Sequence, residues 1–345
     1  MSVKKNASVL YVSSGHLRTL VTAAFRKHGV PDQDAGLVAD ILIEANLRGH
    51  DSHGVLRVPP WIKGISAKAI KAVCNPKVVR NKGATAMILG DYGLGPVVAK
   101  KATALVLRKA KEFGIGLVSV RKASHIGILQ YYSQWLAEKG VIGVAATNTE
   151  PGVAPFGSRQ QILGTNPITI SVPSAHKPYL VDMSTSVAAR GKIVHALEQG
   201  DKIPEGWAVD EDGYPTTNPE KALKGALLPT GGPKGSGLAI MIDLLTGALA
   251  GASVGTRVKG TMNTEQEITK GDLFIAIDPG SVGSNERFVR CVENLASEIH
   301  ESQPVPGVEK VLMPGEFERT NKERNLKNGI NISQKLLDEI HTLAE

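Results

Sequence analysis

From about residue 76 the chain alternates short apolar runs with glycines and helical stretches, and this alternation constrains the fold most. Helices are predicted at about 96–113 and 128–139, between successive apolar runs. Strands that alternate with helices are typical of an α/β fold. We expect strands at 86–89, 116–120, 142–147, 168–172, 179–182 and 273–277.

The N-terminal part of the chain looks helical instead. Apolar residues recur at helical spacing from Ser14 to about Leu47, and Gly29-Val30-Pro31 interrupts them. Asp32 is positioned to cap a second helix. The most apolar segment, Gly235 to Gly255, contains an aspartate and internal glycines, so we expect a buried helix and no membrane span.

The C-terminal part is predicted to hold two more helices, at 286–302 and near 334–343. At 345 residues, the chain is long enough for one large domain or two ordinary ones.

The net charge is +7, and the basic residues come in scattered pairs, which favours a solvated surface over a nucleic-acid partner. A modest positive field would help an anionic substrate or cofactor approach. Cys74 and Cys291 have no metal-ligand or redox spacing. No stretch of signal-peptide type is found, so we expect a cytoplasmic protein with no membrane partner.

Two histidine segments carry the strongest chemical signal. Residues 48–57 place two imidazoles and a hydroxyl between two guanidiniums, a mixture that suits a small anionic substrate whose proton is moved. The alternative is a polar loop between helices, and composition alone favours it. His125 follows a predicted strand and opens a helix, where ligands of α/β sheets usually bind.

Other motifs are weaker. Residues 90–95, GDYGLG, have the wrong glycine spacing for a Rossmann turn. Residues 230–237, TGGPKGSG, suit an anionic phosphate, and equally a packing turn, but they are not a Walker A sequence. His50 and His53 have no third metal ligand at convincing spacing, so no metal site is predicted. A hydrolase triad would need a nucleophile elbow, which the sequence lacks.

The chain resembles the type 2 malate/L-lactate dehydrogenase-like family along nearly its whole length. Residues 254–261 and 269–277 look closest to its archaeal sulfolactate and malate enzymes. The matching segments are RGHDSHG (48–54), ASHIG (123–127), TNTEP (147–151), PFG (155–157), GTNP (164–167), DMSTSVAARGK (182–192), WAVDEDGYPTT (207–217), GGPKGSGLA (231–239) and MPGE (313–316).

The resemblance implies an α/β fold unlike the Rossmann domain. A central α/β domain, at 76–259, would bind a nicotinamide cofactor, NAD or NADP. A helical domain would be built from the N- and C-terminal parts, with 1–75 joined by 260–345. Family members are usually homodimers, so we expect one here.

The resemblance also implies roles for individual residues. His125 would be the proton acceptor, and Ser52 and His53 would match a relay pair of the imine reductase branch. The carboxylate of that relay falls at Lys192, a departure from the pattern. The expected substrate contacts are Arg48, Arg57 and Thr165, and the expected cofactor contacts are Thr149, Asp182, Met183, Ser184, Lys234, Pro314, Gly315 and Glu316.

We therefore expect an oxidoreductase that moves a hydride between NAD(P) and a small dianionic 2-hydroxy acid. One imidazole can serve as base in oxidation and as acid in reduction. Malate/oxaloacetate is favoured, with (R)-sulfolactate/sulfopyruvate as the alternative. A cyclic imine reductase is disfavoured by Lys192, and a metal-dependent hydrolase or a basic binding protein are alternatives from other classes.

Overall fold

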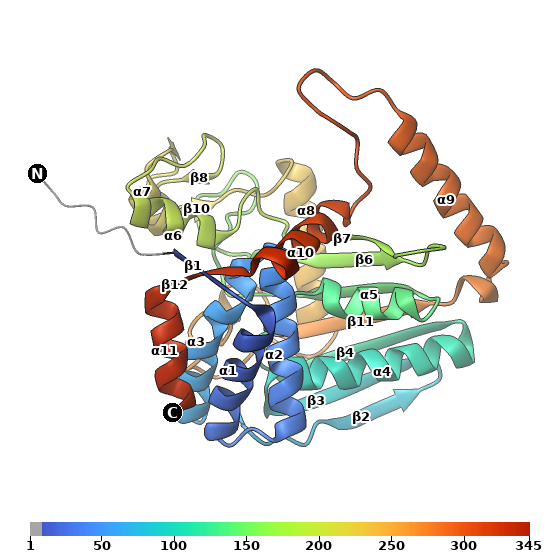
Figure 1. The fold of residues 1–345 in the computed structure, drawn as a ribbon, viewed down its shortest axis with the longest axis horizontal. Coiled ribbons are helices and arrows are strands. Elements are labelled where there is room, and N and C mark those ends of the chain that lie inside the picture. The colour runs from blue at the N-terminus through green and yellow to red at the C-terminus, as the bar shows by residue number, and fades with distance from the viewer. Residues whose placement is uncertain (1–8) are drawn as a thin grey trace, which may run out of the picture.

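A mixed sheet of seven strands lies at the centre of the computed structural model, which describes residues 9–345 (Figure 1). Only β3 and β4 run parallel, while every other neighbouring pair is antiparallel. All the predicted strands are confirmed. In spatial order they are β2 (Lys77–Lys82), β3 (Thr85–Gly93), β4 (Ile115–Ala123), β11 (Gly271–Ile277), β5 (Ile142–Thr147), β6 (Ile168–Val172) and β7 (Tyr179–Met183).

One face of this sheet is covered by α4 (Gly95–Phe113) and α5 (Gln130–Glu138), close to the predicted bounds. The α4 helix makes the crossover between the parallel strands β3 and β4, and it ends at Gly114, whose φ of +80° suits glycine. Tyr132 of α5 packs edge-on against Phe274 of β11. The α/β class is therefore confirmed, without a doubly wound Rossmann sheet.

The path of β11 differs from the expectation that 260–345 returns to the helical part. Phe274 pairs with Val118 of β4 on one side and with Ala145 of β5 on the other. The apolar run 273–277 is buried best between two strands, which accounts for its place in the sheet. The proposed domain boundaries themselves stay a prediction.

The N- and C-terminal parts of the described residues 9–345 meet in a helical layer beside the sheet. Its core joins Leu17, Phe25 and Trp61 to Ile332 and Ile340. Residues 1–8 of the expected helical domain lie outside the described residues. The layer consists of α1 (Ser14–Lys27), α2 (Asp32–Leu47), α3 (Val58–Ser66), α10 (Glu316–Asn328), α11 (Gln334–Ala344) and the antiparallel pair β1 (Val9–Val12) and β12 (Ile330–Ser333).

The predicted cap of α2 is wrong by one residue. Pro31 is the N-cap, and Asp32 is the first helical residue. The carboxylate of Asp32 pairs instead with Arg26 at 2.6 Å. Proline fixes the backbone angle at the helix entry, so no side-chain cap is formed there.

A third, smaller core is separate from those of the sheet and of the helical layer. It is formed mainly by residues 153–239 and includes Val153, Ile193 and Leu227. Its elements are α6 (Arg190–Gln199), α7 (Pro219–Lys224), α8 (Pro233–Asp243) and the small sheet of β8 (Ala208–Val209), β9 (Pro215–Thr216) and β10 (Ala226–Leu227).

The segment expected as a buried helix is only partly buried. The α8 helix passes into a π-turn at Leu244–Ala248, and its inner side carries Ala239 and Ile242. Met241, Leu245 and Leu249 are 52%, 48% and 54% exposed, because the described chain covers one side of the helix only.

The α9 helix (Asn285–Glu301) projects from the body of the molecule, as Figure 1 shows. Its bounds confirm the predicted 286–302. Within residues 9–345, we find no helix with the length and apolar character needed to cross a membrane.

Candidate active site

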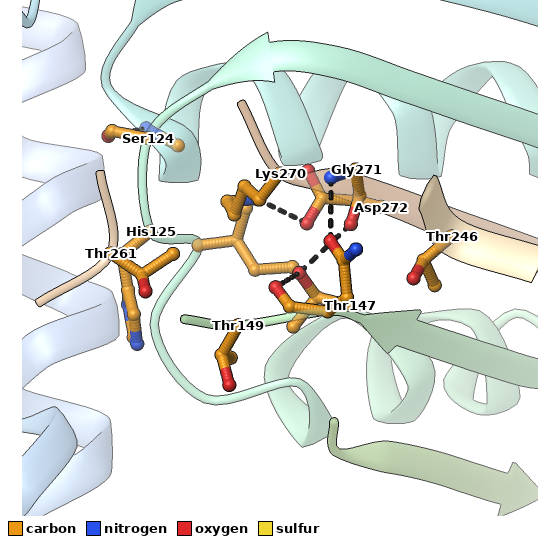
Figure 2. A network of polar contacts seen from close by, with 12 residues as sticks. Ser124, His125, Thr147, Thr149, Thr246, Thr261, Lys270, Gly271 and Asp272 are labelled. Carbon is orange, nitrogen blue, oxygen red and sulfur yellow. Dashed lines mark hydrogen bonds and ion pairs between the residues drawn. The ribbon is translucent and has the colours of Figure 1, made fainter. Parts of the chain in front are cut away.

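A cavity of about 530 Å³ opens where the ends of three strands meet the loop after α2. The C-terminal ends of β4 and β5 lie beside the N-terminal end of the antiparallel β11. The strand ends therefore bring His125, Thr149 and Lys270 to one place (Figure 2). The predicted site residues that line the cavity are Ser52, His53, Arg57, His125, Thr149, Thr165, Asp182, Met183 and Ser184.

The loop after α2 is held by Asn46. Its Oδ1 accepts from the Val55 backbone N–H at 2.8 Å, and its Nδ2 donates to Asp51 at 2.6 Å. A Cβ at Gly54 would lie 2.0 Å from Asn46 Oδ1, so only glycine fits there. These contacts turn the first histidine segment toward the cavity, which Ser52, His53 and Arg57 line.

His53 stands between Ser52 and His125. Its Nδ1 lies 3.0 Å from Ser52 Oγ, and its ring centroid lies 5.3 Å from that of His125. Arg57 Nε donates to the Ser52 carbonyl at 2.7 Å, which keeps the guanidinium beside the imidazoles. Burial, aided by the positive charges of Arg57 and His50, lowers the pKa of His53 to about 3.

His125 follows β4, and its ring is oriented by the backbone. The Gly127 N–H donates to His125 Nδ1 at 3.0 Å, so the neutral ring carries its proton on Nε2. Burial lowers the pKa of His125 well below its ordinary value, and the charges of Arg57, His53 and Lys270 act in the same direction. Both facing imidazoles are therefore neutral at pH 7.

Lys270 also lines the cavity, and the sequence did not single it out. It is 1% exposed and forms an ion pair with Asp272, which is also 1% exposed. A charged residue just before an apolar strand usually marks a solvated strand end, so the sequence carried no signal for this placement. Asn148 Oδ1 accepts from the Gly271 N–H at 2.8 Å and anchors the start of β11.

Thr149 and Thr165 join the ends of two neighbouring strands. The Thr165 N–H donates to Thr149 Oγ1 at 2.9 Å, and the two hydroxyls lie 3.3 Å apart. Asp182 of β7 accepts from the Gln130 N–H at 2.9 Å. Burial raises the pKa of Asp182 to about 6.

The structure does not bring Arg48 to this cavity. Its guanidinium is buried and bonds Glu44 at 2.7 Å, Gln130 at 2.7 Å and Gln134 at 2.6 Å. Its fork is occupied by these partners. It holds Gln130, whose backbone N–H reaches Asp182.

The remaining predicted cofactor residues do not line this cavity. Lys234 is exposed at the second position of α8. Gly315, with φ of +91°, precedes α10, and the Pro314 carbonyl accepts from Leu180 of β7 at 3.1 Å. Glu316 accepts from the Met313 N–H and lies 2.9 Å from His300 Nε2. Lys192 lines the cavity and is exposed, with its ammonium 5.9 Å from the Trp207 ring.

No group of three or more His, Cys, Asp or Glu residues that could hold a metal ion occurs in the described range 9–345. His50 nevertheless lines the cavity, and its buried Nε2 has no hydrogen-bond partner within that range.

Comparison of the sequence with known proteins relates this chain to a family of enzymes. Residues 12–341 match the family Malate/L-lactate dehydrogenase. The chain is 47% identical to L-sulfolactate dehydrogenase of Methanocaldococcus jannaschii, over 95% of this chain and 94% of that protein. It is 38% identical to malate dehydrogenase of Pyrococcus horikoshii, over 97% of this chain and 94% of that protein.

Solved structures show the same fold. The sulfolactate dehydrogenase from Methanocaldococcus jannaschii superposes with a TM-score of 0.92 at 46% identity, covering 97% of this chain and 96% of that chain. Malate dehydrogenase from Pyrococcus horikoshii OT3 superposes with a TM-score of 0.89 at 36% identity, covering 100% of this chain and 97% of that chain.

The fold, the site and the similarity to known dehydrogenases together define an oxidoreductase of the 2-hydroxy acid dehydrogenase class, with NAD or NADP as its cofactor. The chain belongs to the malate/L-lactate dehydrogenase family. The predicted family and enzyme class are thereby confirmed.

Proposed function

We propose that this protein transfers a hydride between NAD(P) and C2 of a small dianionic 2-hydroxy acid, with malate/oxaloacetate favoured. The observation that carries the proposal is the cavity wall, where two neutral imidazoles face the guanidinium of Arg57 and two ammonium groups. Such a wall favours an anion and supplies hydrogen-bond donors to an oxygen that gains negative charge.

Arg57 is proposed to hold the C1 carboxylate. Its Nε is taken by the Ser52 carbonyl, which leaves the outer edge of the fork for two parallel hydrogen bonds. Lys192, exposed on the cavity wall, is proposed to meet the distal anionic group. Arg48 acts on the substrate only indirectly, through Gln130 and Asp182.

His125 is proposed to hold the reacting oxygen. Its predicted role as proton acceptor stays a proposal, and the Gly127 N–H bond to Nδ1 leaves Nε2 as the ring atom that would meet the substrate. We therefore assign His125 to donate a hydrogen bond from Nε2 to the oxygen on C2. His53 and Ser52 are proposed to keep this ring in place.

The residues present fit a nicotinamide dinucleotide. When bound, the cofactor supplies the hydride chemistry. Thr149, Asp182 and Ser184 line the first cavity, and Val187 lines both this cavity and a second hollow of about 610 Å³. Gly231 and Gly232 line the second hollow with φ near +60°, so the backbone there is open to a close ligand.

Lys234 is proposed to meet the pyrophosphate of the cofactor, because it stands at the N-terminus of α8, where the helix dipole favours an anion. The remaining proposed cofactor contacts are Met183 of β7 and the segment beside that strand, Pro314, Gly315 and Glu316.

The decisive experiment is a spectrophotometric panel. Oxaloacetate, sulfopyruvate, pyruvate and 2-oxoglutarate are each reduced with NADH and with NADPH. The exposed ammonium of Lys192 is solvated when pyruvate is bound, so its pairing with a distal anionic group is worth up to about 1 kcal/mol, and kcat/KM for a dianion should exceed that for pyruvate by up to roughly fivefold. Equal kcat/KM for pyruvate and oxaloacetate would contradict the dianion proposal. Higher kcat/KM for sulfopyruvate would select the sulfolactate alternative, which the name of the Methanocaldococcus relative supports.

We also propose that the protein works as a homodimer in the cytoplasm. The free thiols of Cys74 and Cys291 agree with a reducing compartment. The exposed apolar side of α8 offers a surface for a second copy, and its test is given in the Discussion.

A further inference from the structure

A separate cavity of about 280 Å³ lies where the ends of β3 and β4 meet the loop between the π-turn and β11. Among the described residues, none lines both this cavity and the active-site cavity. Cavities that hold organic ligands usually measure about 300–1,000 Å³, so this one fits a small ligand and not a dinucleotide. We call it the basic cavity, and the residues that define it are Tyr92, Arg121, Lys122, Arg257, Glu267 and Thr269.

The basic cavity carries more positive than negative charge. Arg121, Lys122 and Arg257 line it, and none of them forms an ion pair within residues 9–345. The described lining includes one carboxylate, that of Glu267, so three positive charges and one negative charge leave a formal charge of +2. Like charges gathered in a cavity repel one another, and an anion placed among them is bound favourably.

The guanidinium of Arg121 is held in place with donors to spare. Its Nη1 donates to the Gly251 carbonyl at 2.7 Å, whereas its Nε is buried and has no hydrogen-bond partner in the described chain. A Cβ at Gly251 would lie 2.9 Å from Nη1, so glycine permits this close approach. Native structures rarely bury a charged donor without a partner, so the unused Nε–H favours a ligand at this guanidinium.

An irregularity in β4 brings two consecutive cations, Arg121 and Lys122, to the same cavity. Successive side chains of a regular strand point to opposite faces, but Val118, Val120 and Ala123 all belong to the core under α4 and α5. The alternation therefore shifts by one residue before Ala123, and Lys122 has the left-handed φ of +58° there. Irregularities of this kind redirect side chains and are frequent beside functional sites.

The wall that carries Arg257 is fixed by Thr269. The Thr269 hydroxyl donates to the Arg257 carbonyl at 2.9 Å and accepts from the Lys259 N–H at 2.8 Å. The Thr269 carbonyl accepts from the Ser253 N–H at 2.8 Å. These bonds order the loop without any ligand, so less conformational entropy is lost when a ligand binds.

We propose that the basic cavity binds a small doubly charged oxyanion, of the phosphate or dicarboxylate type, at a site separate from the active site. Arg121 holds the oxyanion through its remaining guanidinium donors, and Lys122 and Arg257 add ion pairs. The Tyr92 ring centroid lies 5.1 Å from Lys122 Nζ and supports the ammonium by a cation–π contact. A dianion matches the charge of +2 on the lining, whereas a monocarboxylate neutralises half of it.

The test measures binding of inorganic phosphate by isothermal titration calorimetry at pH 8 and constant ionic strength. The protein is saturated with reduced cofactor, so that the groups that bind the cofactor phosphates are occupied, and no substrate is present. Arg121→Gln should weaken phosphate binding by about tenfold or more, because a charge-assisted hydrogen bond is lost. Arg257→Gln, at an exposed side chain, should weaken it by up to about fivefold.

Two variants serve as controls of place. Arg108→Gln removes a guanidinium from the exposed side of α4, outside the basic cavity, and should keep the wild-type phosphate affinity. Arg57→Gln removes a guanidinium from the active-site cavity and should also leave phosphate binding unchanged. Thermal unfolding of each variant reports that it is folded.

Glu267→Gln gives a result of opposite sign. It removes the carboxylate that opposes an anion, so phosphate should bind about two- to fivefold more tightly. A variant that merely loses structure does not bind a ligand more tightly, so this measurement keeps the proposal open to refutation even if Arg121→Gln fails to fold.

Titrations with succinate and acetate identify the kind of oxyanion. Succinate is a dicarboxylate without a hydroxyl group to oxidise, and acetate carries a single charge. Tighter binding of phosphate than of succinate would assign a ligand of the phosphate type, and the reverse would assign a dicarboxylate. Acetate should bind more weakly than both, and acetate binding as tight as either dianion would contradict the charge argument.

Equal phosphate affinity in wild type, Arg121→Gln and Glu267→Gln would overturn the proposal, as would loss of binding in Arg57→Gln alone. A changed mass of Arg121→Gln in light scattering, with phosphate affinity unchanged, would mean that the cations face a second copy of the chain, and would overturn it too. Failure of the wild type to reduce any 2-oxo acid would contradict the proposed function and not this site, because the titration involves no turnover.

Discussion

His125 is kept neutral by its burial, by the nearby positive charges of Arg57 and Lys270, and by the Gly127 N–H that occupies Nδ1. Arg57 and Lys270 come from other elements, so the state of the ring depends on how the loop after α2 and the start of β11 meet the end of β4.

His125→Ala should lower kcat by about two to four orders of magnitude, because the reacting oxygen loses its donor. The dissociation constant of the reduced cofactor, measured by fluorescence titration, should stay the same. His176→Ala, in an exposed loop, is the control and should keep wild-type turnover. Wild-type turnover of His125→Ala across pH 6–9 would remove His125 from the mechanism and leave His53 as the next candidate.

Asp182 should make stability depend on pH. Burial raises its pKa from 3.8 to about 6, so the folded protein binds more protons than the unfolded chain between these values. The free energy of unfolding therefore falls as the pH rises through this window, by up to about 3 kcal/mol.

Asp182→Asn removes that cost and keeps an oxygen for the Gln130 N–H. Its unfolding free energy in urea should exceed that of wild type at pH 7.5 and match it near pH 4. Asp278→Asn is the control of opposite sign, since Lys111, at 2.8 Å, lowers the pKa of Asp278. An equal difference between Asp182→Asn and wild type at both pH values would contradict the raised pKa.

Single residues also show where sequence reasoning reached its limit. His53 and His125 were predicted because each stands in a chemically unusual segment, and they do line one cavity. Lys270 was missed because its burial depends on the direction of β11, which no local pattern encodes. Arg48 was expected at the substrate, but its partners Gln130 and Gln134 come from a distant helix.

At the scale of elements, β11 is the strand that completes the site, and its start is packed without spare room. A Cβ at Gly271 would lie 1.9 Å from the Thr246 carbonyl oxygen of the π-turn. The strand itself was predicted from its apolar run, whereas its place between β4 and β5 depends on pairing over long sequence distances.

Gly271→Ala should destabilise the protein by about 2–4 kcal/mol, because the backbone of β11 or of the π-turn must shift. It should also lower kcat, since Lys270 would move with the strand. Gly36→Ala, in α2, is the control, because its Cβ would meet only Arg18 at 3.6 Å. That variant should gain about 0.5–1 kcal/mol. Thermal unfolding measures the stability of both variants. A melting temperature of Gly271→Ala equal to that of wild type would contradict the packing argument.

The whole molecule has one sheet face that the described chain leaves partly open. The register places Leu117, Ile275, Val144, Ile170 and Val181 in a row opposite α4 and α5. Ile170 and Val181 are exposed, as are Met241 of α8 and Leu245 of the π-turn. Monomers rarely expose such extended apolar surface, so we expect a second copy to cover it.

Light scattering after gel filtration should give twice the 36.5 kDa mass of one chain. A Met241→Lys, Leu245→Lys double variant should shift the protein toward the monomer, because a lysine is costly to bury unpaired in an apolar interface. Val73→Lys, exposed on the helical side, should leave the mass unchanged. A wild-type mass of one chain at micromolar concentration would contradict the dimer.

The central position of β11 also bears on the order in which the chain is made. During synthesis β4 and β5 leave the ribosome long before residues 271–277, and until then the edges that β11 will occupy have no partner. Strand edges left open in this way invite pairing with other chains. Nascent chains that stop before β11 should therefore aggregate or recruit chaperones, and chains extended past Ile277 should gain protease resistance in a single late step.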